Sequence, residues 1–301
     1  MLVSAALIGK NYQPVRSLLD SNWLRENHAA PEEQLDKNEQ QGLSVIKEIT
    51  SQILKDGSTI TIGVAKDGSD FCKLYGSKAN AHLLFNRRVL QSLSGKITLL
   101  TKLSKNTWEQ MVHSLPDEPD QLILAIKKKK EDELGILIGL HDESKYNLSK
   151  DELYFVLCHE ILGHYQNHDN EKLVRTKLIV TLISLVVIGI FGNSLPNSTP
   201  FFIFYFMLSL FFTALASSKV EFYNECNADC AGFHDKPAKQ GAKTFFKKML
   251  VAETAQKRYY ELKGIEGNKL ENWKKEYHFG HPSAESRYRS LLKVTQNQDL
   301  K

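Results

Sequence analysis

Two apolar stretches, residues 178–192 and 201–216, constrain this 301-residue chain most strongly, because such runs must lie in a membrane or a protein core. Each is slightly shorter than the roughly 20 residues that cross a bilayer, and uncharged neighbours extend both. Arg175 and Lys177 precede the first run and Lys219 follows the second. Because basic residues beside spans stay in the cytoplasm, we expect a transmembrane hairpin with cytoplasmic outer ends. The alternative is a helical hairpin buried in a large soluble core.

The rest of the chain has the composition of a globular protein that does not bind nucleic acid. Its formal net charge is +4 at pH 7, and the basic run 127–130 is most simply a solvated strand end or turn. The four cysteines, Cys72, Cys158, Cys226 and Cys230, are too few and irregular for a disulfide framework, so a reducing compartment suits them. The apolar run near the start lacks the features of a secretion signal. We therefore expect an integral protein of an inner or plasma membrane, facing the cytoplasm.

The pattern outside the hairpin predicts an α+β fold. Residues 40–54 have helical apolar spacing, and Ser149 and Glu152 form a capping-box pattern that opens a helix running to about His168. Residues 220–232 and 244–263 are also helical in pattern. Five segments resemble strands, and the last two would form a hairpin: 59–64, 81–85, 96–103, 121–126 and 134–140.

The stretch His159-Glu160-Ile161-Leu162-Gly163-His164 differs by one residue from the His-Glu-x-x-His pattern of zinc peptidases. Five residues of α-helix turn through about 500°, which leaves the two imidazoles roughly 140° apart. A π-bulge would return both to one face, and Gly163 would ease it. A second possibility pairs His164 with His168, which are correctly spaced at i and i+4. The third is that no metal binds.

Residues after the hairpin supply the remaining groups of a metal site. Glu225 in Glu-Cys-Asn-Ala-Asp could be the third ligand, and Asp229, one turn later, could hydrogen-bond a ligand imidazole. His281, followed by Pro282, and Arg287 form a further polar cluster. Cysteines 158, 226 and 230 more simply pack as small hydrophobes.

The ordered motifs LSKDELYFVLCHE, GHYQNH, two apolar spans, ECNAD and GHPSAESR resemble the HtpX and CAAX prenyl endopeptidase family of integral-membrane zinc metallopeptidases. Asn80-Ala81 also resembles the family's Asn-Ala before its active-site strands. The resemblance covers roughly residues 75–292. It implies a zincin-like domain with a small antiparallel sheet, active-site helices and an inserted transmembrane hairpin.

The resemblance also implies roles for individual residues. His159, His164 and Glu225 would bind zinc, Glu160 would be the general base, and Asp229 would support a ligand. Arg287 and His281 would help to hold the substrate or its oxyanion. The inserted residue departs from the family pattern at His159 and Glu160.

The predicted function is a membrane-anchored zinc endopeptidase that cleaves unfolded or flexible polypeptides in quality control or processing. An extended peptide could pair with an edge strand of the 121–140 hairpin. The alternatives are an inactive membrane scaffold that binds a partner, and a sensor whose peptidase acts on one repressor. The predicted parts are an amino-terminal region of unknown role, 1–70; a β-rich part with the first active-site helix, 71–177; the hairpin, 178–218; a second active-site helix and helical C-terminal part, 219–292; and a frayed tail, 293–301.

Overall fold

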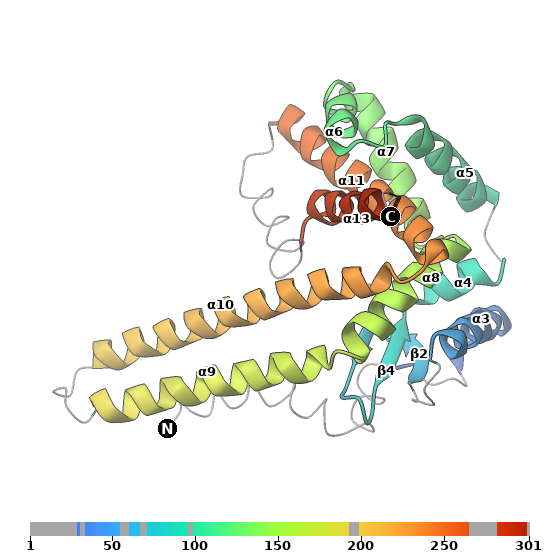
Figure 1. Cartoon of the computed structure of the whole chain (residues 1–301). Helices are drawn as coiled ribbons and strands as arrows, with labels where there is room; N and C mark the ends of the chain where they lie inside the picture. The colour runs from blue at the N-terminus through green and yellow to red at the C-terminus, as the bar shows by residue number, and fades with distance from the viewer. Residues whose placement is uncertain are drawn as a thin grey trace.

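A computed structural model describes residues 29–30, 34–54, 60–66, 71–95, 99–192, 199–264 and 282–299. Within these residues the protein is a mostly helical α+β fold, with a small sheet on one side and two long helices projecting from the body (Figure 1). The helices are α3 (Lys37–Ile53), α4 (Arg87–Leu93), α5 (Leu99–Ser114), α6 (Pro119–Lys127), α7 (Glu131–Ser144), α8 (Lys150–Cys158), the π-helix η2 (His159–Tyr165), α9 (Asp169–Gly192), α10 (Thr199–Gly232), α11 (Lys236–Leu262) and α13 (Ala284–Asp299).

The sheet is mixed, and the prediction of an antiparallel sheet was correct only in part. Its strands are β1 (Ala29–Ala30), β2 (Thr61–Ala65), β3 (Cys72–Tyr75) and β4 (His82–Phe85), in the order β1-β2-β4-β3. β2 runs parallel to β4, whereas β1 and β3 are antiparallel to their neighbours. All four residues of β4 are buried. The strands expected near 59–64 and 81–85 are therefore confirmed, and β3 lies at one edge beside η2.

Three expected strands were wrong, because residues 99–103, 121–126 and 134–140 are helical. In α6, Leu122 and Ile126 are fully buried while Leu124 is 53% exposed; a strand would turn all three to the same face. In α7, Leu134 and Leu137 are buried and Ile136 is 56% exposed, which again is helical spacing. The proposed 121–140 β-hairpin and its peptide-binding edge therefore do not exist.

The helical body packs around α11, which contacts α6, α7, α8 and α13. Gly241 permits the close approach of α8, since a Cβ at this position would lie 1.9 Å from the carbonyl oxygen of Asp151. The helix expected at 244–263 is confirmed as part of α11. The helix expected at 40–54 is confirmed as α3, which begins with a capping box made by Asp36 and Glu39.

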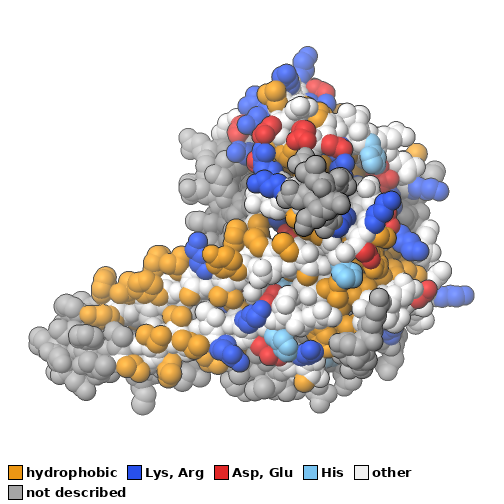
Figure 2. Space-filling view, viewed as in Figure 1, with side chains coloured by type: hydrophobic (Ala, Val, Ile, Leu, Met, Phe, Trp, Pro, Cys, Tyr) orange, Lys and Arg blue, Asp and Glu red, His pale blue; other side chains and the backbone are white. Residues whose placement is uncertain are grey.

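The two projecting helices, α9 and α10, pack side by side and correspond to the expected hairpin (Figure 1). Residues 203–232 of α10 are long and apolar enough to cross a membrane, and only 11% of the tested window is buried. Within the described residues α10 alone meets that criterion, although exposed apolar side chains such as Leu182 also occur on α9. Figure 2 shows apolar side chains along both helices and basic side chains where they join the body.

Helix α10 does not end where the apolar run ends. It continues as one helix to Gly232, so the separate helix expected at 220–232 is its last part. The same continuous helix therefore carries the apolar residues and both acidic residues of the Glu-Cys-Asn-Ala-Asp motif.

Candidate metal centre

A π-helix brings the two histidines of the motif together. Ser149 and Glu152 form the expected capping box at the start of α8, and α8 passes directly into η2. The amide of Gln166 donates to the carbonyl of Ile161 over five residues, the spacing of a π-helix. As a result His159 Nε2 and His164 Nε2 lie 3.1 Å apart. The hypothesis of a π-bulge is confirmed.

Glu225 of α10 completes a three-sided cluster with these imidazoles. Its carboxylate oxygens lie 3.5 Å from His159 Nε2 and 3.4 Å from His164 Nε2. Ligands about 2.05 Å from a tetrahedral zinc ion lie about 3.3 Å from one another, so these three spacings suit one ion. His159, Glu160 and His164 also offer ligand atoms that all lie within 4.8 Å of one another.

Each imidazole has a carboxylate at its other ring nitrogen. His159 Nδ1 lies 3.0 Å from Asp229 Oδ1, and His164 Nδ1 lies 3.0 Å from Asp169 Oδ2. Such contacts fix the ring orientation and leave Nε2 for a metal. The contact of Asp229 matches expectation, but the sequence analysis missed Asp169. Its only signal in the sequence is an acidic residue five positions after His164.

Arg287 of α13 holds Asp229 and also approaches Glu225 of the cluster. Its guanidinium donates to both carboxylate oxygens, at 2.7 and 2.5 Å, and lies over the ring of Phe246. It also lies 3.7 Å from a Glu225 oxygen. Arg287 thus contacts two carboxylates of the metal site, and its expected contact with substrate stays a prediction.

The charges of the cluster favour a cation. Burial opposes a charge on His164, but the hydrogen bonds that its ring donates to the carboxylates of Asp169 and Glu225 dominate and raise its pKa to about 10. Burial likewise opposes a charge on His159, and Asp229 and Glu225 raise its pKa. Burial raises the pKa of Glu160, which suits a group that must accept a proton. Burial would raise the pKa of Asp229, yet Arg287 and His159 lower it.

The close approach of η2 and α10 requires the glycine of the motif. A Cβ on Gly163 would lie 2.5 Å from both Cα and Cβ of Ala228. Ala228 lies between Glu225 and Asp229 and is fully buried. Gly163 therefore lets α10 come near enough for Glu225 to reach both histidines.

The other predicted site residues lie elsewhere. His168, the alternative ligand, has a left-handed backbone with φ of 56° and pairs with Glu171 at 3.3 Å. It does not pair with His164 as a second ligand. His281 lies outside the described residues. Cys72 of β3, which the sequence analysis did not connect with the site, hydrogen-bonds the side chain of Glu160.

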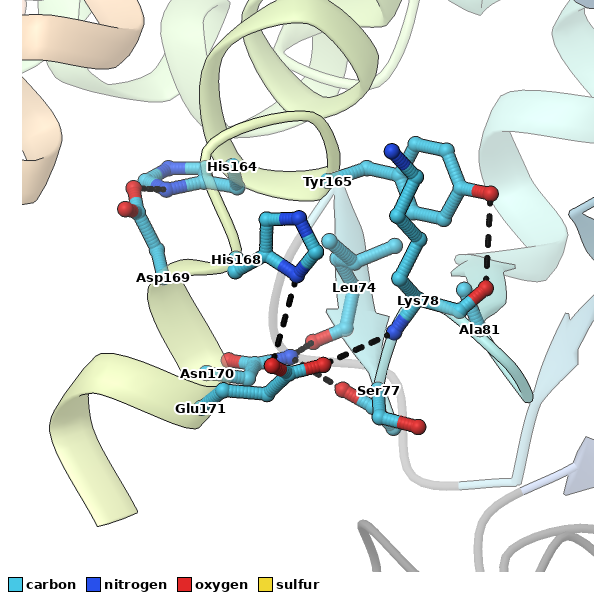
Figure 3. A pocket seen from close by; sticks show the side chains of 11 residues that line it. Leu74, Ser77, Lys78, Ala81, His164, Tyr165, His168, Asp169, Asn170 and Glu171 are labelled. Atoms are coloured by element: carbon cyan, nitrogen blue, oxygen red, sulfur yellow. Dashed lines mark hydrogen bonds and ion pairs between the residues drawn. The ribbon is translucent and has the colours of Figure 1, made fainter. Parts of the chain in front are cut away.

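A small pocket, lined in part by His164 and Asp169, adjoins the cluster between the β3–β4 turn and the start of α9. Figure 3 shows His164 turned toward Asp169, and His168 turned toward Glu171. The Glu171 carboxylate also accepts from the amide of Lys78. Polar side chains of α9 thus contact both η2, through Asp169, and the β3–β4 turn, through Glu171.

Comparison with known proteins places this arrangement in a family. Residues 95–295 match the model of peptidase family M48, and the match covers the π-helix, both projecting helices and most of α13. The chain belongs to peptidase family M48, the HtpX- and Ste24-like zinc metallopeptidases. No curated protein and no solved structure matches the chain significantly.

The residues present fit a zinc ion. Two imidazoles and one carboxylate at tetrahedral spacing are a known catalytic zinc set that leaves a fourth position open. The carboxylates behind both imidazoles add further negative charge, for which Arg287 compensates only in part. The protein is thus an M48 metallopeptidase with a candidate zinc-binding centre.

Proposed function

We propose that this protein is a membrane-anchored zinc endopeptidase that cleaves flexible polypeptides at the membrane surface. The observation that carries the proposal is the convergence of His159, His164 and Glu225 at ligand spacing, with Glu160 beside them. Zinc bound there would polarise the scissile carbonyl and lower the pKa of an attacking water.

Glu160 has the position and environment of the general base. It follows His159 directly, and its buried carboxyl has a raised pKa, so it can take a proton from water and return it to the leaving amine. Cys72 donates to this carboxyl and helps to hold it. Asp229 and Asp169 keep the two imidazoles oriented, and Arg287 holds Asp229.

The apolar residues of α10 support a site close to the bilayer. Phe222 and Tyr223 are 40% and 64% exposed, and Tyr223 lies two residues before Glu225, or about 3 Å along the helix axis. Arg175, Lys177 and Lys219 flank the apolar runs, which supports a cytoplasmic body in an inner or plasma membrane. Flexible cytoplasmic segments, including loops of membrane proteins, are then the accessible substrates.

Strand β3 replaces the disproved hairpin as the place for an extended substrate. It lies at the sheet edge next to η2, and its Cys72 contacts Glu160. A peptide that paired with β3 would pass in front of the candidate base. Such binding reads the backbone more than side chains, which suits a role in quality control or processing of unfolded chains.

The decisive experiment compares the wild type with Glu160→Gln on an unstructured polypeptide, using detergent-purified full-length protein loaded with zinc. Loss of a general base lowers turnover by about 10² to 10⁴-fold. Zinc content and circular dichroism should not change. Glu48→Gln, at an exposed position on α3, is the matched control and should retain full turnover.

Equal, zinc-dependent turnover by Glu160→Gln would contradict the role of Glu160. Absence of turnover in the wild type, on a range of unfolded substrates, would instead favour an inactive scaffold that retains the peptidase fold.

A further inference from the structure

The two imidazoles of the metal centre are supported from two different helices of the projecting pair. Asp229, which contacts His159, belongs to α10, and Asp169, which contacts His164, is the first residue of α9. The family pattern of Glu225 and Asp229 accounts for the first contact but leaves the second unassigned.

Asp169 is held firmly by three separate interactions. Its side chain is buried; Oδ2 lies 3.0 Å from His164 Nδ1, and Oδ1 accepts from Lys172 Nζ at 3.1 Å. Its backbone carbonyl accepts from the Asn224 side chain of α10 at 3.5 Å. Asn224 precedes Glu225, so one contact joins the start of α9 to the helix turn that carries the candidate third ligand.

This geometry settles which nitrogen of His164 is available. A carboxylate at Nδ1 favours the tautomer with a proton there and leaves the Nε2 lone pair for an ion. His164 Nε2 is the atom that lies near both His159 Nε2 and Glu225. Asp169 itself contacts the far side of the ring, where it cannot reach the ion.

We propose that Asp169 is a positioning residue for His164, through which α9 contributes to zinc affinity. The inference depends on the proposed zinc site. It makes the first apolar helix a part of the metal centre as well as an anchor, since α9 supports one imidazole and α10 supports the other.

A purely local role for Asp169 gives a different expectation. Asp169 also pairs with Lys172 in the first turn of α9, where an acidic residue stabilises a helix. Glu171 is an acidic residue of the same turn, but it contacts His168 and Lys78 and not His164 (Figure 3). Glu171→Ala is therefore the matched control, because it removes a first-turn charge without touching the imidazole.

The test measures zinc affinity by chelator competition on detergent-purified full-length protein, for the wild type, Asp169→Ala, Asp169→Asn and Glu171→Ala. Loss of such a partner typically weakens metal binding by about 10 to 100-fold, which we expect for Asp169→Ala. Asparagine can still accept from Nδ1, so Asp169→Asn should bind more tightly than the alanine variant. Glu171→Ala should match the wild type. The visible absorption of bound Co²⁺ should change in Asp169→Ala only.

Equal zinc affinity in Asp169→Ala and the wild type, or an equal loss in Glu171→Ala, would overturn the proposal. If Asp169→Ala fails to fold, as shown by its melting temperature without metal, Asp169→Asn decides, because it should then bind zinc more weakly than both the wild type and Glu171→Ala. A wild type that binds no zinc would overturn the proposed function together with this inference, whereas a zinc-binding wild type with unaffected variants would overturn the inference alone.

Discussion

The guanidinium of Arg287, on α13, donates two hydrogen bonds to the carboxylate of Asp229, which lies 58 residues earlier in the sequence on α10. Asp229 in turn contacts His159 at 3.0 Å. A residue near the C-terminus thus acts on the candidate metal ligands through one carboxylate.

Replacing Arg287 by lysine should weaken zinc binding roughly tenfold, because lysine cannot make both hydrogen bonds and Asp229 would lose its fixed orientation. Zinc titration of the purified variant measures the effect. The Michaelis constant of zinc-loaded enzyme should change little. A large increase in that constant with unchanged zinc affinity would instead show that Arg287 holds the substrate.

Replacing Glu225 by alanine should remove zinc from the protein, because two imidazoles alone leave the ion without its third protein ligand. Metal analysis should give about one zinc per wild-type chain and much less in the variant. Glu221→Ala, one turn earlier on α10, is the control and should keep its zinc. A zinc content of one per chain in Glu225→Ala would rule out Glu225 as a ligand.

Replacing Gly163 by alanine should destabilise the protein by about 1 to 3 kcal/mol and weaken zinc binding, because the new Cβ would press against Ala228. Gly139 offers a contrasting site on α7, where a Cβ would meet nothing within 4 Å. Gly139→Ala should stabilise by up to about 1 kcal/mol through helix propensity. Thermal melting and zinc titration of both variants would show whether the two effects have opposite signs.

Acid should destabilise the protein partly through His141, which lies beside Trp108 at 5.5 Å between ring centroids. Burial lowers the pKa of His141 from 6.5 to about 4. The unfolded chain therefore binds a proton between these pH values that the folded chain excludes. The contribution of neutral His141 to the free energy of unfolding is therefore fully present above pH 6.5. It is lost as the pH falls toward 4, by an amount on the order of 3 kcal/mol.

His141→Leu should therefore lose less stability than the wild type between pH 7 and pH 4, and melting temperatures across this range would measure the difference. The exposed His113, replaced in the same way, is the control for the loss of one histidine. Parallel melting curves of the wild type and His141→Leu would contradict the assignment.

The π-helix was predictable because its cause is local. The spacing of His159 and His164 is incompatible with one face of a regular helix, and Gly163 lies within the interval. The capping box at Ser149 is local as well. Both follow from residues within a few turns of one another.

The three false strands had a different origin. Leu124 and Ile136 are large apolar residues on the exposed faces of α6 and α7. A polar residue at either position would have shown the helical spacing of the buried residues, whereas an apolar one made the segment resemble a strand. The role of Cys72 depends on a contact of β3 with Glu160 that is distant in the sequence, and no spacing specifies it. Asp169 lies only five residues after His164, but their contact depends on the turn at 166–168 between η2 and α9, which the expected continuous helix did not contain.

Because α10 is one continuous helix, the direction in which Glu225 points about the helix axis is fixed relative to the apolar residues of the same helix. One residue inserted between them would rotate Glu225 by about 100° about the helix axis and direct it away from the two histidines. An insertion of seven or eleven residues would rotate Glu225 by only about 20°. It would move the metal centre roughly 10 or 16 Å along the helix axis, away from the apolar part. The length of this helix can therefore vary in such steps but not by single residues, and each step would place the metal centre at a different distance from the apolar part of α10.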